Sequence, residues 1–129
     1  MDIFESVLEF WKIGHPDLIR NKPGFPDEEV TRLNMRLIGE EFDELHAAVH
    51  DDDLVETADA LADLLYVVAG MAVTHGIPLE EVFAEVHRTN MAKFPGGVAI
   101  RRPSDGKIMK PEGWQPPDVE SILKKSKRA

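Results

Sequence analysis

Two sets of carboxylates stand close together in the sequence at spacings that could bind metal ions. The first is Glu40, Glu41 and Glu44, and on a helix Glu41 falls near the middle of an apolar stripe with Glu44 beside it and Glu40 at its edge. The stripe consists of Val30, Leu33, Leu37, Ile38, Leu45, Ala48 and Val49. Carboxylates directed together toward a core repel one another and cost several kcal/mol unless they are paired. A shared divalent cation would remove both penalties.

The second set, Glu56, Asp59 and Asp63, lies on one face of a helix that starts near Asp53. The opposite face is apolar and contains Leu54, Ala58, Leu61, Leu65, Val68 and Ala72. Past Asp63 the acidic face also becomes apolar, which predicts a helix that is buried on both sides. Carboxylates at the edge of a buried face, opposite a second acidic set, are typical ligands of Mg²⁺ or Mn²⁺. We expect two or more such ions per site.

The elements that must position these carboxylates are helices. Periodicity and capping residues predict a first helix that ends near Gly14, a second from Pro26 to His50, a third that ends at His75-Gly76, and a fourth from Pro78 through Met91. The turn Asp51-Asp52-Asp53 is so short that the second and third helices must return antiparallel. The predicted fold class is therefore all-α.

The residue composition changes after Phe94, where turn-forming residues dominate. We expect a helical domain over residues 1–95 and an irregular extension over 96–129 that packs on the helices. The dipeptide Asp105-Gly106 predicts a small hairpin with arms at 100–102 and 107–110. Asp118 is expected to cap a last short helix, and the basic end from Lys124 to Arg128 is expected to be disordered.

The composition of the chain narrows the classes of function that it can have. The net charge is -9, but residues 1–100 hold 7 Lys and Arg against 20 Asp and Glu, whereas residues 101–129 hold 8 against 4. Such an acidic body disfavours nucleic acid as a partner, although bound cations would reverse the local sign and admit a polyphosphate. The chain lacks cysteine, a signal-peptide pattern and an unbroken apolar run of membrane-spanning length. We therefore expect a soluble cytoplasmic protein with no membrane partner.

The paired motifs resemble those of a known superfamily. Glu40-Glu41-x-x-Glu44 followed by Glu56-x-x-Asp59 is similar to the EExxE and ExxD pair of the all-α nucleoside triphosphate pyrophosphohydrolases, which include the MazG-like, dimeric dUTPase and phosphoribosyl-ATP pyrophosphohydrolase branches. The segment 58–66 resembles the third helix of these enzymes. The segment 87–93 resembles the phosphate-contacting Asn-x-x-Lys of the MazG-like dUTPase branch. The likeness covers about residues 1–95.

This resemblance implies a four-helix-bundle-type, oligomeric fold and a metal-dependent hydrolase. The expected reaction converts a nucleoside triphosphate, with dUTP the first candidate, to the monophosphate and pyrophosphate in nucleotide-pool housecleaning. A homodimer or higher homo-oligomer is expected, also because a fully apolar third helix needs further cover.

One departure from the pattern leaves the ligand set open. In many relatives the second motif would place its Asp on Asp63 and its Glu on position 60, but this chain has Ala60 there. Either Glu56 and Asp59 are direct metal ligands with Asp63 outside the direct set, or Asp59 and Asp63 carry the role.

The pyrophosphohydrolase hypothesis also assigns expected roles to individual residues. Glu40, Glu41 and Glu44 are the catalytic candidates, and Glu40 is the one expected to orient or deprotonate the attacking water. The resemblance implies that Asn90 and Lys93 hold phosphate oxygens. Lys107, Lys110 and Trp114 are candidates for a flap that closes on the nucleotide, although Trp114 could equally pin the tail to the helices.

Two other functions compete with this hypothesis. His50-Asp51, with His46 or His75, could belong to an HD-type metal phosphohydrolase, but the pair falls at a helix end. A non-enzymatic helical dimerisation module with a basic tail would explain the uneven charge. It would not explain Glu41 inside an apolar stripe.

Overall fold

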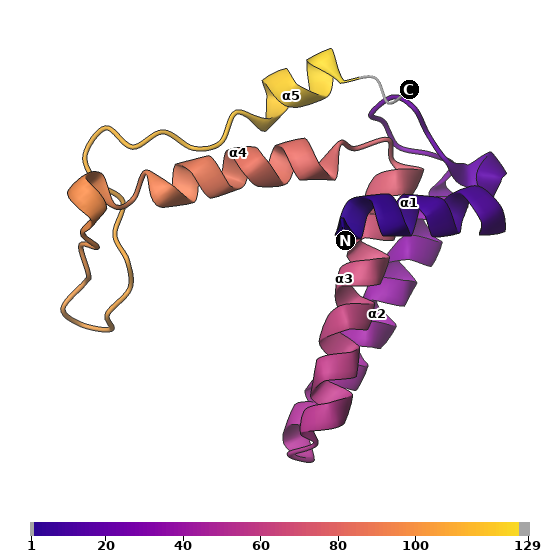
Figure 1. Cartoon of the computed structure of the whole chain (residues 1–129), viewed down its shortest axis with the longest axis horizontal. Helices are drawn as coiled ribbons and strands as arrows, with labels where there is room; N and C mark the ends of the chain where they lie inside the picture. Colours follow the sequence, from indigo (N-terminus) through magenta and orange to yellow (C-terminus); the bar gives the residue numbers. More distant parts are fainter. Residues whose placement is uncertain (1, 127–129) are drawn as a thin grey trace. The chain divides into compact units, whose positions relative to one another are not determined.

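The chain folds into helices joined by short turns and one long irregular segment (Figure 1). The structure, a computed structural model, describes residues 2–126. Its elements in that range are α1 (Ile3–Gly14), η1 (Pro16–Leu18), α2 (Glu28–His50), α3 (Leu54–Thr74), α4 (Leu79–Met91), η2 (Pro95–Gly97) and α5 (Val119–Lys125). The described residues form two compact units, one that runs to Leu79 and one at Glu80–Lys125. The predicted all-α class is confirmed for this part of the chain.

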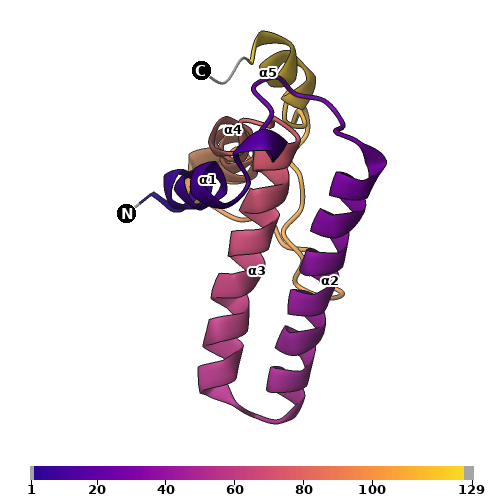
Figure 2. The same cartoon turned by 90° about the vertical axis from the view of Figure 1, so that its right-hand side faces the viewer.

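Helices α2 and α3 lie side by side as an antiparallel hairpin, as predicted (Figure 2). Their turn is closed by backbone bonds from Asp51 to Ala47 and from Asp53 to Ala48, and Asp52 adopts a φ of 52°. The side chain of Asp53 then caps α3 by accepting a hydrogen bond from the Glu56 amide at 3.0 Å. The tight turn fixes the register in which the two acidic sets face each other.

Buried polar contacts hold the opposite end of the hairpin. Asn34 on α2 donates to the Thr74 hydroxyl of α3 at 2.8 Å, and both side chains are almost completely buried. The next residue, His75, lies 2.9 Å from the hydroxyl of Thr31 through Nε2 and 2.8 Å from the Met71 carbonyl through Nδ1. Because a carbonyl oxygen can only accept, Nδ1 carries the proton and the hydroxyl of Thr31 donates to Nε2. These bonds join the two helices near the start of α2.

Helix α1 packs across α3 and supplies the largest buried side chain of the first unit. Val7 and Trp11 form a core with Ala69 and Val73 of α3. Trp11 can approach α3 closely because residue 70 is glycine, where an added Cβ would lie only 2.9 Å from the indole nitrogen. Trp11 is therefore part of the core of this unit. Phe10 remains 52% exposed.

The expectation that the third helix is buried on both sides is wrong for the single chain. Its buried residues are Ala60, Ala69, Gly70, Ala72, Val73 and Thr74. In contrast, Leu54, Leu61, Leu65 and Val68 are 80%, 50%, 55% and 39% exposed. Among the described residues, α1 and α2 are the helices that pack most extensively on α3, and they leave this apolar face in contact with solvent.

Helix α3 is also, by length and composition alone, apolar enough to cross a membrane. This follows from its mean hydropathy of 1.4, and not from an unbroken apolar run of that length, which α3 does not contain. The core helix of a soluble protein meets the same criterion. Moreover, α3 carries Glu56, Asp59 and Asp63, and ionised carboxylates are costly inside a bilayer.

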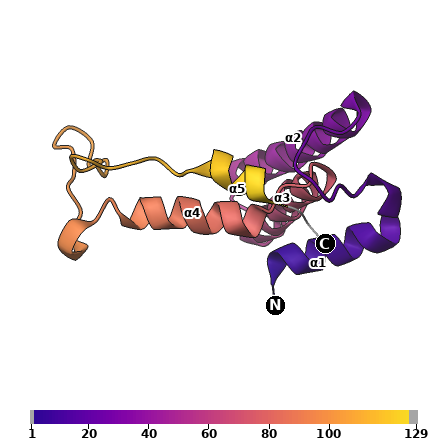
Figure 3. The same ribbon diagram turned by 90° about the horizontal axis from the view of Figure 1, so that it is seen from above.

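The second unit is built on α4, along which the irregular tail returns (Figure 3). The predicted hairpin is present as a single antiparallel bridge between Arg101 and Ile108, with Gly106 at a φ of 76°. Farther on, the amide of Asp118 donates to the Glu85 carboxylate at 2.7 Å. Arg88 binds the same carboxylate, and these two donors lower the pKa of Glu85 to about 2. Charge-assisted bonds thus hold the tail to α4.

The expected disorder of the basic end is partly wrong. Lys124 and Lys125 belong to the last turn of α5, where Lys124 pairs with Glu120 at 3.1 Å and complements the helix dipole. The expected cap is confirmed, because the Asp118 side chain accepts from the Ser121 amide at 3.2 Å. The rest of the predicted disordered end, residues 127–128, lies outside the described residues.

Gly76 gives a direct test of this architecture. Its φ is +64°, and an added Cβ would lie 2.1 Å from the Lys22 carbonyl oxygen. We expect Gly76→Ala to lower the free energy of unfolding by at least about 2 kcal/mol, because left-handed backbone and a backbone clash are combined. Urea denaturation followed by circular dichroism measures the change. Gly14→Ala is the matched control, since nothing lies within 4 Å of its added Cβ, and an equal loss in both variants would contradict the account.

Candidate metal centre

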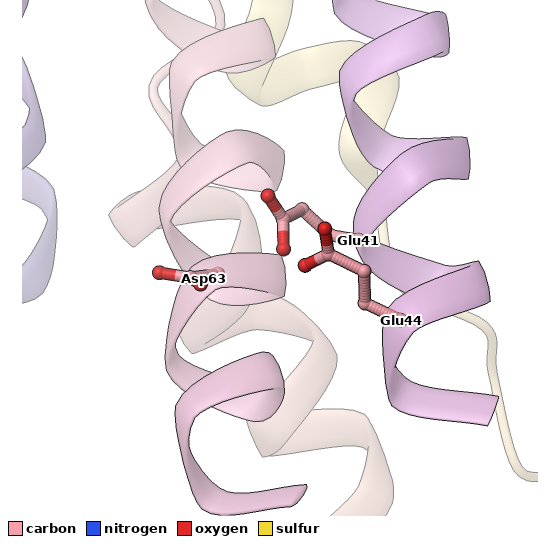
Figure 4. A group of neighbouring side chains, drawn as sticks. All are labelled: Glu41, Glu44 and Asp63. Carbon is pink, nitrogen blue, oxygen red and sulfur yellow. The ribbon is translucent and has the colours of Figure 1, made fainter. Parts of the chain in front are cut away.

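The structure brings Glu41 and Glu44 of α2 together with Asp63 of α3 (Figure 4). Each residue offers one carboxylate oxygen, and these three oxygens all lie within 4.8 Å of one another. Glu41 and Glu44 extend from α2 toward α3 because they lie one turn apart on the same side of the helix. We call these three residues the acidic cluster.

Glu41 lies deepest in the acidic cluster. Its Oε2 atom is buried and has no hydrogen-bond partner within the described part of the protein. Burial raises the pKa of Glu41 most, followed by the adjoining carboxyl of Glu44 and then by the charges of Asp63 and Asp59. A buried acceptor without a donor is unfavourable, so the site as built favours a bound cation or proton at this oxygen.

Asp63, on α3, is in an environment that disfavours its charged form, as Glu41 is. Burial raises its pKa, and the neighbouring charges of Asp59 and Glu44 raise it further. Among residues 2–126, none of the ion pairs involves Glu41, Glu44, Asp59 or Asp63. The protein therefore concentrates negative charge here without supplying a basic side chain to neutralise it.

A groove of about 370 Å³ adjoins the acidic cluster toward the turn of the hairpin. Its acidic lining consists of Glu44, Asp51, Asp53, Glu56 and Asp59, and small side chains, Ala47, Ala48 and Ala60, leave the space between the helices open. Glu44 belongs to both the acidic cluster and the lining of the groove. Asp59 lines the groove next to the cluster. Asp51 and Asp53 were not among the residues predicted for the site between α2 and α3, although the shortness of the turn was the signal that could have placed them there.

The six predicted metal ligands do not all lie together. Glu41, Glu44 and Asp63 form the acidic cluster, while Asp59 adjoins it and Glu56 lines the groove. Glu40 lies outside both, with a side chain that is 61% exposed and 3.9 Å from Arg36. The structure groups Asp63 with the first motif, and Glu56 lies closer to the turn.

The predicted substrate-binding residues lie in the second unit. Lys93 follows the end of α4, where its amide binds the Asn90 carbonyl at 3.1 Å, and both Lys93 and Lys110 lie over the ring of Trp114. Trp114 also donates to the Thr89 carbonyl at 2.7 Å, so it does pin the tail to α4. Lys107 is exposed, and its backbone closes the hairpin turn with Asp105 and Arg102.

The histidines of the competing HD-type hypothesis are not brought together. His50 and Asp51 are 3.3 Å apart but exposed at the turn of the hairpin. His75 is buried at the far end of α3 in contact with Thr31 and Thr74, and the ring of His46 lies 6.4 Å from that of Phe42. No shared metal position exists among these residues.

The donor set of the acidic cluster fits a hard divalent cation. Carboxylate oxygens alone, with no thiolate or imidazole, are the ligands that Mg²⁺ and Mn²⁺ prefer. A bound cation would also supply the partner that the buried Oε2 of Glu41 lacks. Glu41, Glu44 and Asp63 are the residues that would hold it, with Asp59 next to them.

The raised pKa of Glu41 predicts a stability effect of known sign. Because the folded state holds this proton more tightly than the unfolded state, the metal-free protein loses stability as the pH rises through the raised pKa. We expect Glu41→Gln to increase the melting temperature in EDTA at neutral pH and to abolish the further increase caused by Mn²⁺. Differential scanning calorimetry measures both changes.

Asp43→Asn is the matched control for Glu41→Gln. Asp43 lies on the same helix but is exposed and outside the acidic cluster. It should leave the melting temperature in EDTA and the effect of Mn²⁺ unchanged. A Glu41→Gln variant that still gains stability from Mn²⁺ as the native chain does would show that Glu41 is not a ligand.

Two comparisons with known proteins give matches that include the α2–α3 hairpin or most of the chain. The family model described as phosphoribosyl-ATP pyrophosphohydrolase matches residues 13–90, which include α2, α3 and almost all of α4. An uncharacterized protein of Acanthamoeba polyphaga mimivirus is 38% identical over 104 residues, or 77% of this chain. The aligned region covers only 41% of that viral protein.

Proposed function

The chain belongs to the phosphoribosyl-ATP pyrophosphohydrolase family, within the all-α nucleoside triphosphate pyrophosphohydrolases, and on this premise we propose that it hydrolyses a nucleoside triphosphate between the α and β phosphates. The family membership supports a hydrolase of pyrophosphate bonds. The observation that carries the finer proposal is the acidic cluster with its unpartnered buried Glu41 oxygen. Such a cluster, poised for cations, suits the binding of a triphosphate.

The proposed reaction adds one water to the nucleotide. The water oxygen bonds to the α-phosphorus, the bond from that phosphorus to the bridging oxygen breaks, and the products are the monophosphate and pyrophosphate. Bound Mg²⁺ or Mn²⁺, two or more per site, would lower the pKa of the water and neutralise the phosphate chain. Glu41, Glu44, Asp59 and Asp63 would position the ions, with Glu56 supporting them from the groove.

A carboxylate must also take or orient the proton of the attacking water. We assign this role to Glu40, which borders the α2 motif but lies outside the acidic cluster. Its side chain is 61% exposed, with Arg36 as a neighbour at 3.9 Å, so its carboxylate oxygens can accept a hydrogen bond from a water molecule. In this assignment Glu40 contributes to the rate and the cluster contributes to metal binding.

The decisive experiment is a panel of nucleoside and deoxynucleoside triphosphates with ³¹P NMR of the products. With Mg²⁺ or Mn²⁺ we expect monophosphate and pyrophosphate, with dUTP the first candidate, and we expect no turnover in EDTA. Orthophosphate as the sole product would contradict α–β cleavage. A chain that neither binds Mn²⁺ in calorimetry nor hydrolyses any nucleotide would support the dimerisation module instead.

Variants separate the proposed roles in that assay. Glu44→Ala and Asp59→Ala should lose metal binding and activity together, because each removes charge from the metal site. Glu40→Gln should lower kcat by about a hundredfold, in the range of general-base catalysis, while metal binding persists. If Glu40→Gln keeps full activity, a group other than Glu40 orients or deprotonates the attacking water.

We also propose that the protein acts as a homodimer or higher homo-oligomer with a four-helix-bundle-type core. The exposed apolar face of α3, with Leu54, Leu61, Leu65 and Val68, supports this proposal because a second hairpin would cover it. We further propose that the enzyme is cytoplasmic and has no membrane partner. The net charge of -9 disfavours nucleic acid as a partner.

Static light scattering tests the assembly. At micromolar concentration we expect at least twice the 14.5 kDa chain mass. Leu61→Glu together with Leu65→Glu should shift the mass toward the monomer, since charges would then be buried at the interface. The control is Ile13→Glu, at an exposed α1 residue away from this face. A native monomer would contradict the proposal.

A further inference from the structure

Arg36 is the permanent cation of the hairpin that lies next to the acidic motifs. Helix α2 contains six Asp and Glu residues and α3 contains three, but the lysine and arginine residues of the two helices are Arg32 and Arg36 alone. The guanidinium of Arg32 is already paired, since it binds Glu28 at 2.6 Å. Arg36 stands one helical turn before Glu40 and therefore beside the first acidic set.

The ion pair between Arg36 and Glu40 is loose. The two side chains approach to 3.9 Å, which is beyond hydrogen-bonding distance, and they are 68% and 61% exposed. The order of the charges is also the less favourable one, because an acid stabilises a helix best when it precedes its basic partner by four residues, as Glu28 precedes Arg32. Structural pairing thus accounts for Arg32 but explains little about Arg36.

Arg36, Glu40 and Glu44 lie along one row of α2 that leads into the acidic cluster. They occur at intervals of four residues, so neighbouring members are about 6 Å apart along the helix axis. Glu44 belongs to the acidic cluster and extends toward α3 (Figure 4). The row therefore places a guanidinium two turns from Glu44, with the carboxylate assigned to the attacking water between them.

We propose that Arg36 binds the β and γ phosphates of the nucleoside triphosphate, the part that leaves as pyrophosphate. This inference rests on the proposed function, to which it adds a substrate-binding residue on α2. Cations at the acidic cluster and water at Glu40 place the α-phosphorus at their end of the row, so the outer phosphates are the part that reaches Arg36. A guanidinium suits these phosphates because its planar fork donates two parallel hydrogen bonds to their oxygens.

Binding of the phosphates by Arg36 would also release Glu40. The guanidinium would exchange an exposed carboxylate at 3.9 Å for a more highly charged phosphate chain, which leaves Glu40 to the attacking water. Negative charge increases on the leaving pyrophosphate as the bond breaks, so the contact is stronger in the transition state than in the bound substrate. Arg36 would therefore contribute to kcat as well as to substrate binding.

Calorimetry with inorganic pyrophosphate in the presence of Mn²⁺ tests the contact without requiring turnover. Arg36→Ala should weaken pyrophosphate binding by at least about tenfold, the loss of a charge-assisted contact, while Mn²⁺ alone binds as it does to the native protein. Arg36→Lys should recover part of the affinity, since it restores the charge but not the fork.

Arg32→Ala is the matched control, because it removes the other arginine of α2 at a similarly exposed position. It should bind pyrophosphate as the native protein does. Equal affinity in Arg36→Ala and Arg32→Ala would overturn the proposal. A native protein that binds Mn²⁺ but not pyrophosphate would overturn it too.

Glu40→Gln shows whether Arg36 acts on the phosphates or only through Glu40. A direct contact predicts that this variant binds pyrophosphate at least as tightly as the native protein, because Arg36 loses its competing carboxylate. A loss of affinity in Glu40→Gln equal to that in Arg36→Ala would contradict a direct contact.

Hydrolysis of dUTP, or of the best substrate in the triphosphate panel, separates this inference from the proposed reaction. Arg36→Ala should lower kcat/KM by at least about tenfold and should also lower kcat. If Arg36→Ala keeps the native kinetics and the native pyrophosphate affinity, the contact is wrong and the reaction stands. If no nucleotide is hydrolysed but pyrophosphate binding depends on Arg36, the contact stands and the reaction is wrong.

Discussion

Repulsion among carboxylates that face one another across two helices is the constraint on which the rest of the structure depends. Glu41, Glu44 and Asp63 hold their oxygens within 4.8 Å, and burial, together with the neighbouring carboxylates, raises the pKa values of Glu41 and Asp63. A fold that gains nothing from this arrangement would turn one of the three toward solvent. The arrangement is understandable if the charges are neutralised in the working state, which is what divalent cations would do.

The two ends of the hairpin keep the helices from separating under this repulsion. The turn Asp51–Asp53 closes one end through backbone bonds, and the buried contacts of Asn34, Thr74 and His75 close the other. The small residues Ala48 and Ala60 leave open the space of the groove between the helices. Stability is thus supplied at the ends, while the middle carries the functional charges, a division that is common where function opposes stability.

Much of the hairpin could be predicted from the sequence because its signals are local. Helix caps, the position of Gly76 and the place of Glu41 in an apolar stripe are read within a few residues, and the structure agrees with them. The burial of α3 could not be predicted from one chain, since its apolar face shows only that cover is needed and not what supplies it. The choice between Asp63 and Glu56 depended on rotation about the helix axis, which spacing alone left open.

The contacts of the tail also could not be predicted from residues that are close together in the sequence. The bond between Trp114 and Thr89 joins residues that are 25 positions apart, and Glu85 binds the amide of Asp118 across 33 positions. No periodicity marks such pairs, because the tail between them is irregular. Composition predicted turns there, but the partner of each side chain depends on the path by which the tail returns along α4.

Crystals grown with Mn²⁺ and measured at its absorption edge would test the central claim most directly. The account predicts an anomalous peak between α2 and α3, within bonding distance of carboxylate oxygens of Glu41, Glu44 and Asp63. Peaks confined to other acidic residues, with Glu41 turned away from α3, would contradict it.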